Sequence, residues 1–68
     1  MQISARNQLP GRVTAVRMGN VMAEVTIDIG SGKSLTAAIT RASAEALGLK
    51  EGDQVTAIIK STEIIVGK

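Results

Sequence analysis

Hydrophobic and polar residues alternate along residues 21–29, which read "VMAEVTIDI". A period of two is typical of a half-buried strand, because successive side chains of a strand point to opposite faces. The apolar residues that would share the buried face are Val21, Ala23, Val25, Ile27 and Ile29. The pattern therefore predicts a strand with one face in a core and the other in solvent.

Turn signals on both sides of this segment divide the chain into further strands. Gly-Asn within residues 18–20 and the glycines of "GSGK", residues 30–33, favour tight turns of the hairpin kind. β-Branched residues are frequent between these turns. The strands predicted in this way span residues 11–17, 21–29, 34–40, 54–60 and, last and shortest, 61–68.

Residues 40–53, "TRASAEALGLKEGD", have a different composition that is rich in helix formers. Thr40 or Ser43 can cap a helix of about two turns, and Gly48 stands where a C′ glycine belongs. The fold class is therefore all-β with one short helix, in the order β-β-β-α-β-β. This is the order of a five-stranded OB-like barrel, here one domain of residues 1–68. Pro10 lacks a backbone N–H, so we expect it at an edge position.

The small size of the chain predicts association with other copies of itself. A chain of 68 residues buries a small share of its surface, so its fold usually needs further stabilisation by disulfides, a metal or partner subunits. Cysteine and histidine are both absent from the sequence, which removes disulfides and the commonest zinc ligands. Ile58 falls on the opposite strand face from Val55, Ala57 and Ile59, which indicates that this second face is also covered.

Composition and charge argue against nucleic-acid binding and against a membrane location. The net charge is only +2 and no aromatic residue is present, so the stacking platforms of single-strand nucleic-acid binders are missing. No signal peptide and no apolar run of membrane-spanning length is recognisable, which favours a cytoplasmic location without a membrane partner.

No arrangement of residues suggests catalysis or a bound metal cation. Serines lack a histidine partner, and "GSGK" lacks the full spacing of a phosphate loop. The carboxylates show no spacing suited to acid–base chemistry; they are Glu24, Asp28, Glu45, Glu51, Asp53 and Glu63. We therefore expect no enzyme activity.

Hydrogen-bond donors instead gather in two short polar segments and at the predicted helix start. We call these segments the polar islands; they are "SAR" at residues 4–6 and "IKST" at residues 59–62. The donor side chains are Ser4, Arg6, Thr40, Ser43, Lys60 and Ser61. An unprotonated oxyanion needs donors rather than acceptors, and arginine offers a planar fork to paired oxygens. Each residue also has a purely structural reading, as a helix cap, a terminus-ordering group or an exposed strand end. Nothing in the sequence forces the donors to converge within one subunit.

The segments "SARNQLPG", "AITRASAEALGLKEGD" and "AIIKSTEIIV" together resemble the molbindin (Mop) family over essentially the whole chain. The resemblance implies an OB-like subunit, a cytoplasmic homohexamer built as a trimer of dimers, and molybdate or tungstate held at subunit interfaces. Pro10 departs from the family pattern, where a more variable and often basic residue is expected.

The resemblance also assigns site residues. It implies that Ser4, Arg6, Lys60 and Ser61 are anion donors, assisted by the backbone amides of Ala5 and Ile59. It implies that a neighbouring subunit contributes Thr40 and Ser43. A second anion site near the threefold axis would use backbone groups around Gly19, Asn20 and Val21.

The leading functional hypothesis is storage, buffering or delivery of molybdate or tungstate. Two alternatives remain open at this point. An OB fold can bind nucleic acid, although the absence of aromatic residues argues against this. The chain could also be a purely structural homo-oligomer.

Overall fold

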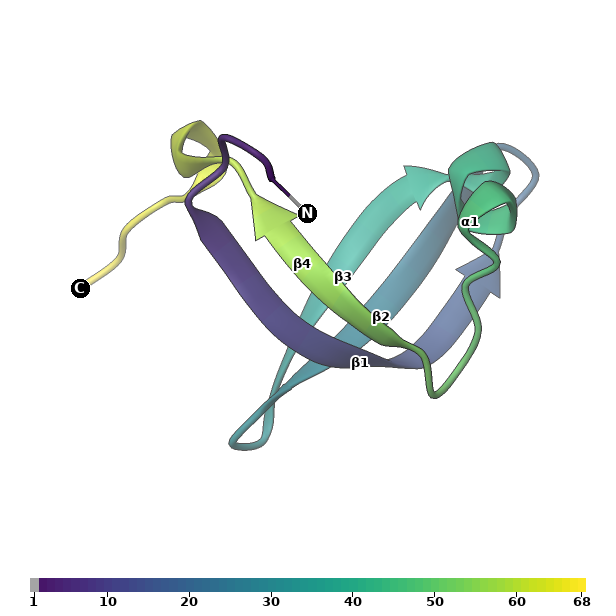
Figure 1. Cartoon of the computed structure of the whole chain (residues 1–68), viewed down its shortest axis with the longest axis horizontal. Helices are drawn as coiled ribbons and strands as arrows, with labels where there is room; N and C mark the ends of the chain where they lie inside the picture. Colours follow the sequence, from purple (N-terminus) through teal and green to yellow (C-terminus); the bar gives the residue numbers. More distant parts are fainter. Residues whose placement is uncertain (1) are drawn as a thin grey trace.

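The computed structural model describes residues 2–68 and shows an antiparallel sheet with one short helix (Figure 1). The strands are β1 (Asn7–Met18), β2 (Met22–Gly30), β3 (Lys33–Thr40) and β4 (Gln54–Ile59). The helix α1 (Arg41–Leu47) joins β3 to β4, and a 3₁₀ turn η1 (Ser61–Glu63) follows β4. The prediction of an all-β fold with one short helix is therefore confirmed.

β1 is the longest of the four strands, and its two halves pair with different neighbouring strands. The sheet order is β3-β2-β1-β4. The first half of β1 pairs with β4 from Asn7 to Arg12, and the second half pairs with β2 from Arg12 onward. Pro10 therefore lies where β1 has a partner on one side only, which agrees with the edge position expected for a residue without an N–H.

The strand predicted over residues 11–17 is longer in the structure, because residues 7–10 also pair with β4. The alternation over residues 21–29 is confirmed in β2, where Ala23, Val25 and Ile27 are buried. Val21 was predicted to face the core and is 72% exposed, so that prediction is wrong. It lies in the bend between β1 and β2, where the pleat that produces the alternation ends.

The predicted fifth strand over residues 61–68 is absent. Residues 61–63 form η1, and residues 64–68 pair with no strand in the described part of the chain. A strand needs a neighbour for its backbone N–H and C=O groups, and the described residues provide none there. Ile65 and Val66 are consequently left 94% and 88% exposed, on the segment that leads away from the body (Figure 1).

The helix begins and ends as its sequence predicts. The Oγ1 atom of Thr40 accepts a hydrogen bond from the N–H of Ser43 at 3.0 Å. Gly48 adopts the left-handed conformation with φ of 62°, which a glycine reaches without steric cost. The turn at residues 50–53 is closed by the N–H of Lys50, which donates to Oδ2 of Asp53 at 3.0 Å.

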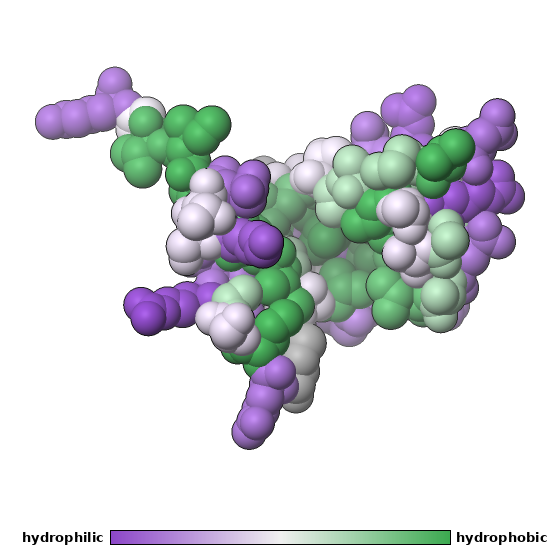
Figure 2. All heavy atoms as spheres, turned by 90° about the horizontal axis from the view of Figure 1, so that it is seen from above, coloured by the Kyte–Doolittle hydropathy of each residue, from purple (hydrophilic) through white to green (hydrophobic). Residues whose placement is uncertain are grey.

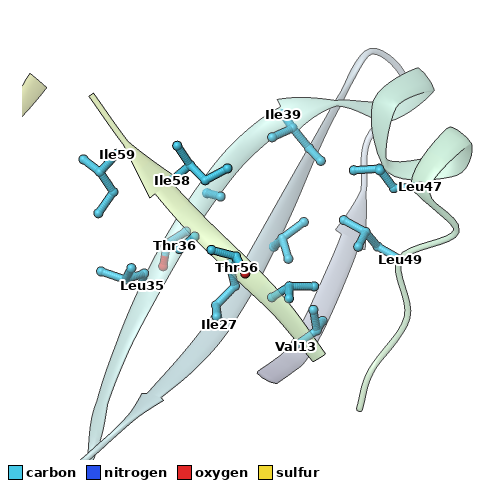
Figure 3. Close-up of a pocket in the computed structure, with 14 residues that line it drawn as sticks. Val13, Ile27, Leu35, Thr36, Ile39, Leu47, Leu49, Thr56, Ile58 and Ile59 are labelled. Atoms are coloured by element: carbon cyan, nitrogen blue, oxygen red, sulfur yellow. The ribbon is translucent and has the colours of Figure 1, made fainter. Parts of the chain in front are cut away.

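The buried core is small and a wide apolar groove opens beside it. Val13, Val25 and Ile27 form the core cluster. The groove has a volume of about 450 Å³ and is lined by the four strands, α1 and the loop after α1 (Figure 3). Ile39, Leu49 and Ile58 all reach into it (Figure 3). The space-filling view likewise shows hydrophobic side chains around a hollow between the two ends of the molecule (Figure 2).

No helix in residues 2–68 is long and apolar enough to cross a membrane.

We predict that Gly11→Ala destabilises the fold. A Cβ atom at Gly11 would lie 2.5 Å from Cγ2 of Ile27 and 2.8 Å from the carbonyl oxygen of Asp28. Relief of this overlap requires β1 and β2 to separate, at a cost of about 1–3 kcal/mol in the free energy of unfolding. Urea denaturation measures the loss. Gly67→Ala is the matched control, because nothing lies within 4 Å of its added Cβ. Equal midpoints for both variants would contradict the close approach.

Candidate functional site

Pairing of β1 with β4 brings the two polar islands of the sequence together. Asn7 opens β1 and lies opposite Ile59, the last residue of β4. The segment before Asn7 and the segment after Ile59 must therefore leave the sheet side by side, although 52 positions separate the two residues. Figure 1 shows the purple segment that precedes β1 and the 3₁₀ turn η1 at the same end of the molecule.

A cavity of about 570 Å³ lies between these segments, and we call it the polar cavity. It is lined by Ile3, Ser4, Ala5, Arg6, Ile58, Lys60, Ser61 and Thr62. Five residues assigned by the resemblance thus meet in one place within a single chain. Their convergence is what the sequence left undetermined.

The polar cavity is a cationic, donor-rich site. Arg6 and Lys60 each bring a positive charge, and within residues 2–68 neither forms an ion pair with a carboxylate. The cavity lining, all of it in the described part of the chain, contains hydroxyls but no Asp or Glu side chain. Such a donor set suits an anion with several oxygens, and the lining residues include none of the Asp, Glu, His or Cys side chains that most often bind metal cations. Likewise, no cluster of three possible metal ligands occurs among residues 2–68.

Ile59 is near this site but does not line the cavity. Its side chain lines the apolar groove, and its carbonyl oxygen accepts a hydrogen bond from Nδ2 of Asn7 at 3.2 Å. Ile58, its neighbour, lines both the polar cavity and the apolar groove. One strand end therefore forms a wall between the two spaces.

Thr40 and Ser43 do not join the polar cavity within one chain. They lie at the start of α1, at the end of the molecule opposite η1 (Figure 1). The two hydroxyl oxygens are hydrogen-bonded to each other at 2.7 Å, in addition to the helix cap. In the single chain these residues have the structural role of a cap.

The loop predicted as a second anion site is held by backbone hydrogen bonds. The N–H of Gly19 donates to the carbonyl oxygen of Met22 at 2.7 Å, and the carbonyl oxygen of Val21 accepts from the N–H of Arg41 at 2.8 Å. Gly19 lines a hollow of about 350 Å³, which Asn20 and Val21 do not line. The Gly19 N–H is therefore already engaged within the chain.

Sequence reasoning missed three residues of the polar cavity. Thr62 adds a third hydroxyl on the η1 side, and its place directly after Lys60 and Ser61 was the available signal. Ile58 gave an indirect signal through its position on the polar strand face. Ile3 gave none, because a single apolar residue near a chain end has no periodic pattern to reveal its place.

Comparison with known proteins places the chain in a family. The TOBE domain family matches residues 3–66, so the chain belongs to it. Molybdenum-pterin-binding protein 3 of Clostridium pasteurianum is 52% identical over 66 residues, which cover 97% of both chains. Molybdenum-pterin-binding protein 1 of the same organism is 47% identical over the same coverage. The resemblance to the Mop family is thereby confirmed.

Solved structures agree with this assignment. MopII of Clostridium pasteurianum has a TM-score of 0.93 and 45% identity over 98% of this chain and 100% of its own. A molybdate-binding protein from Sporomusa ovata also has a TM-score of 0.93, at 46% identity and full coverage of both chains. The names of these relatives describe binding proteins, in agreement with the expectation that the chain is not an enzyme.

We predict that Thr40→Ala lowers the free energy of unfolding by about 1 kcal/mol, the usual cost of removing an N-cap oxygen. The N–H of Ser43 would lose its acceptor. Thermal or urea unfolding measures this loss. Thr40→Ser is the matched control, because it keeps the oxygen and should retain most of the stability. A Thr40→Ser variant as unstable as Thr40→Ala would show that the cap is not the cause.

Proposed function

We propose that the chain is a molybdate-binding domain, formed by residues 1–68, that stores, buffers or delivers the anion in the cytoplasm. The observation that carries this proposal is the convergence of Ser4, Arg6, Lys60 and Ser61 on one cavity without a carboxylate in its lining. The names of the Clostridium and Sporomusa relatives support molybdate as the ligand. Tungstate has the same charge and tetrahedral shape, so we propose it as a second ligand.

Capture of molybdate in this cavity is a matter of matched charges and donors. Arg6 and Lys60 offset the two negative charges, and the hydroxyls of Ser4 and Ser61 direct hydrogen bonds to separate oxygens. A hydrogen bond to a charged group is worth about 1.5–3 kcal/mol. Fixed donors also fit one span between oxygens, which favours molybdate over the smaller sulfate.

The complete site would be shared between subunits. We propose a homohexamer, a trimer of dimers, in which Thr40 and Ser43 of a neighbouring subunit face the polar cavity, with the amides of Ala5 and Ile59 assisting. The apolar groove and the exposed segment Ile64–Val66 support an assembly, because a free subunit would leave both in water. We propose that the five-stranded barrel closes only in this assembly. We also propose that a second anion site forms there, at Gly19, Asn20 and Val21.

The first test is molybdate binding by calorimetry, with sulfate as the control anion. Arg6→Ala and Lys60→Ala should each weaken binding by roughly ten- to a hundredfold, because each removes a charged donor. Arg12→Ala is the matched control: it removes the same charge from an exposed β1 residue outside the polar cavity, and should leave affinity nearly unchanged. Equal effects of Arg6→Ala and Arg12→Ala would refute a local site.

The second test is assembly, measured by native mass spectrometry at micromolar concentration. We expect a particle of six 7.0 kDa chains that gains molybdate and ignores sulfate. Ile65→Asp should weaken assembly, because it charges a side chain that is 94% exposed in the single chain. Ser31→Asp is the matched control, since Asp tolerates the left-handed conformation at Ser31, where φ is 55°. A stable 7.0 kDa monomer of the unmodified chain would contradict the shared site, and binding of oligonucleotides instead of molybdate would favour the nucleic-acid alternative.

A further inference from the structure

Two amide side chains directly after the first polar island hold the backbone on both sides of the polar cavity. Nδ2 of Asn7 donates to the carbonyl oxygen of Ile59 at 3.2 Å, across the β1–β4 pair. Nε2 of Gln8 donates to the carbonyl oxygen of Ala5 at 2.7 Å. Each amide group must present its NH₂ here, since the partner is a carbonyl oxygen that can only accept.

Each of these bonds fixes a whole peptide unit that borders the cavity. A trans peptide is planar, and its N–H points opposite to its C=O. No cis peptide occurs in the described chain. Gln8 therefore orients the N–H of Arg6 through the oxygen of Ala5, and the Asn7 side chain adds a restraint, beside the β1–β4 ladder, on the peptide that carries the N–H of Lys60.

In the described part of the chain, the two oriented N–H groups are available as donors. Within residues 2–68, neither the N–H of Arg6 nor that of Lys60 donates to another backbone group. Both residues line the polar cavity. The two carbonyl oxygens, which would repel an oxyanion, are meanwhile occupied by the Asn7 and Gln8 amides.

We propose that Asn7 and Gln8 are positioning residues of the oxyanion site, which hold the backbone N–H groups of Lys60 and Arg6 as preorganised donors to the bound anion. This inference rests on the proposed molybdate-binding function. It adds two further backbone groups to the proposed donor set, and it gives the "NQ" pair after "SAR" a role at the site. Preorganised donors favour binding because little conformational freedom remains to be lost.

The test uses the full chain labelled with ¹⁵N and titrated with sodium molybdate, followed by both NMR and calorimetry. Asn7→Ala should weaken molybdate binding by about tenfold and reduce the molybdate-induced shift of the Lys60 amide, while the Arg6 amide still responds. Gln8→Ala should do the reverse, with loss of the Arg6 response. Gln54→Ala, at an exposed β4 position outside the cavity, is the matched control and should keep both responses.

Opposite effects of the two variants on the Lys60 and Arg6 amides would distinguish a positioning role from a general loss of structure. If either variant lowers both amide responses equally, or leaves affinity unchanged, the positioning role is wrong. Should Asn7→Ala fail to fold, Asn7→Val replaces it, because valine favours strands and has no donor. Absence of molybdate binding by the unmodified chain would refute the proposed function itself, whereas binding that is insensitive to Asn7 and Gln8 would refute this inference alone.

Discussion

The antiparallel pairing of β1 with β4 is the interaction on which both the fold and the candidate site depend. It joins the beginning of the sheet to its end, from Asn7 opposite Ile59 to Arg12 opposite Gln54. The same strand pairing brings the two polar islands together around the polar cavity. A slip of one residue would turn every side chain of β4 to the other face, so that Ile58 would no longer separate the polar cavity from the apolar groove.

The distribution of charge makes the polar cavity a positively charged site. Elsewhere, three basic residues have acidic partners, in the pairs Arg17–Glu24 at 3.7 Å, Arg41–Glu45 at 3.0 Å and Lys50–Asp53 at 3.3 Å. The polar cavity keeps Arg6 and Lys60 apart from such partners within the described residues. Cations without a carboxylate partner in the described chain, next to hydroxyl groups, make an environment that an oxyanion can neutralise.

The same small chain leaves much apolar surface uncovered. Among residues 2–68, five apolar residues are buried, whereas the groove and the C-terminal segment present isoleucine, leucine and valine to solvent. Water exposure of this amount is unfavourable for an isolated domain. A subunit interface would bury that surface and, in the proposed assembly, complete the anion site, so stability and ligand binding would be linked by mass action.

Local chemistry was sufficient to predict much of this protein from its sequence. Alternation in β2, the Thr40 cap and the Gly48 terminus each depend on residues close in the chain, so the strands, the helix and the donor types were predictable. The tertiary structure decided what depends on distant partners. It extended β1 to Asn7 because β4 pairs there, and it left residues 61–68 without a strand because no other described segment pairs with them. It also placed Arg6 and Lys60 in the lining of one cavity. A periodic pattern reports which face of an element is apolar, but only strand pairing determines which elements meet.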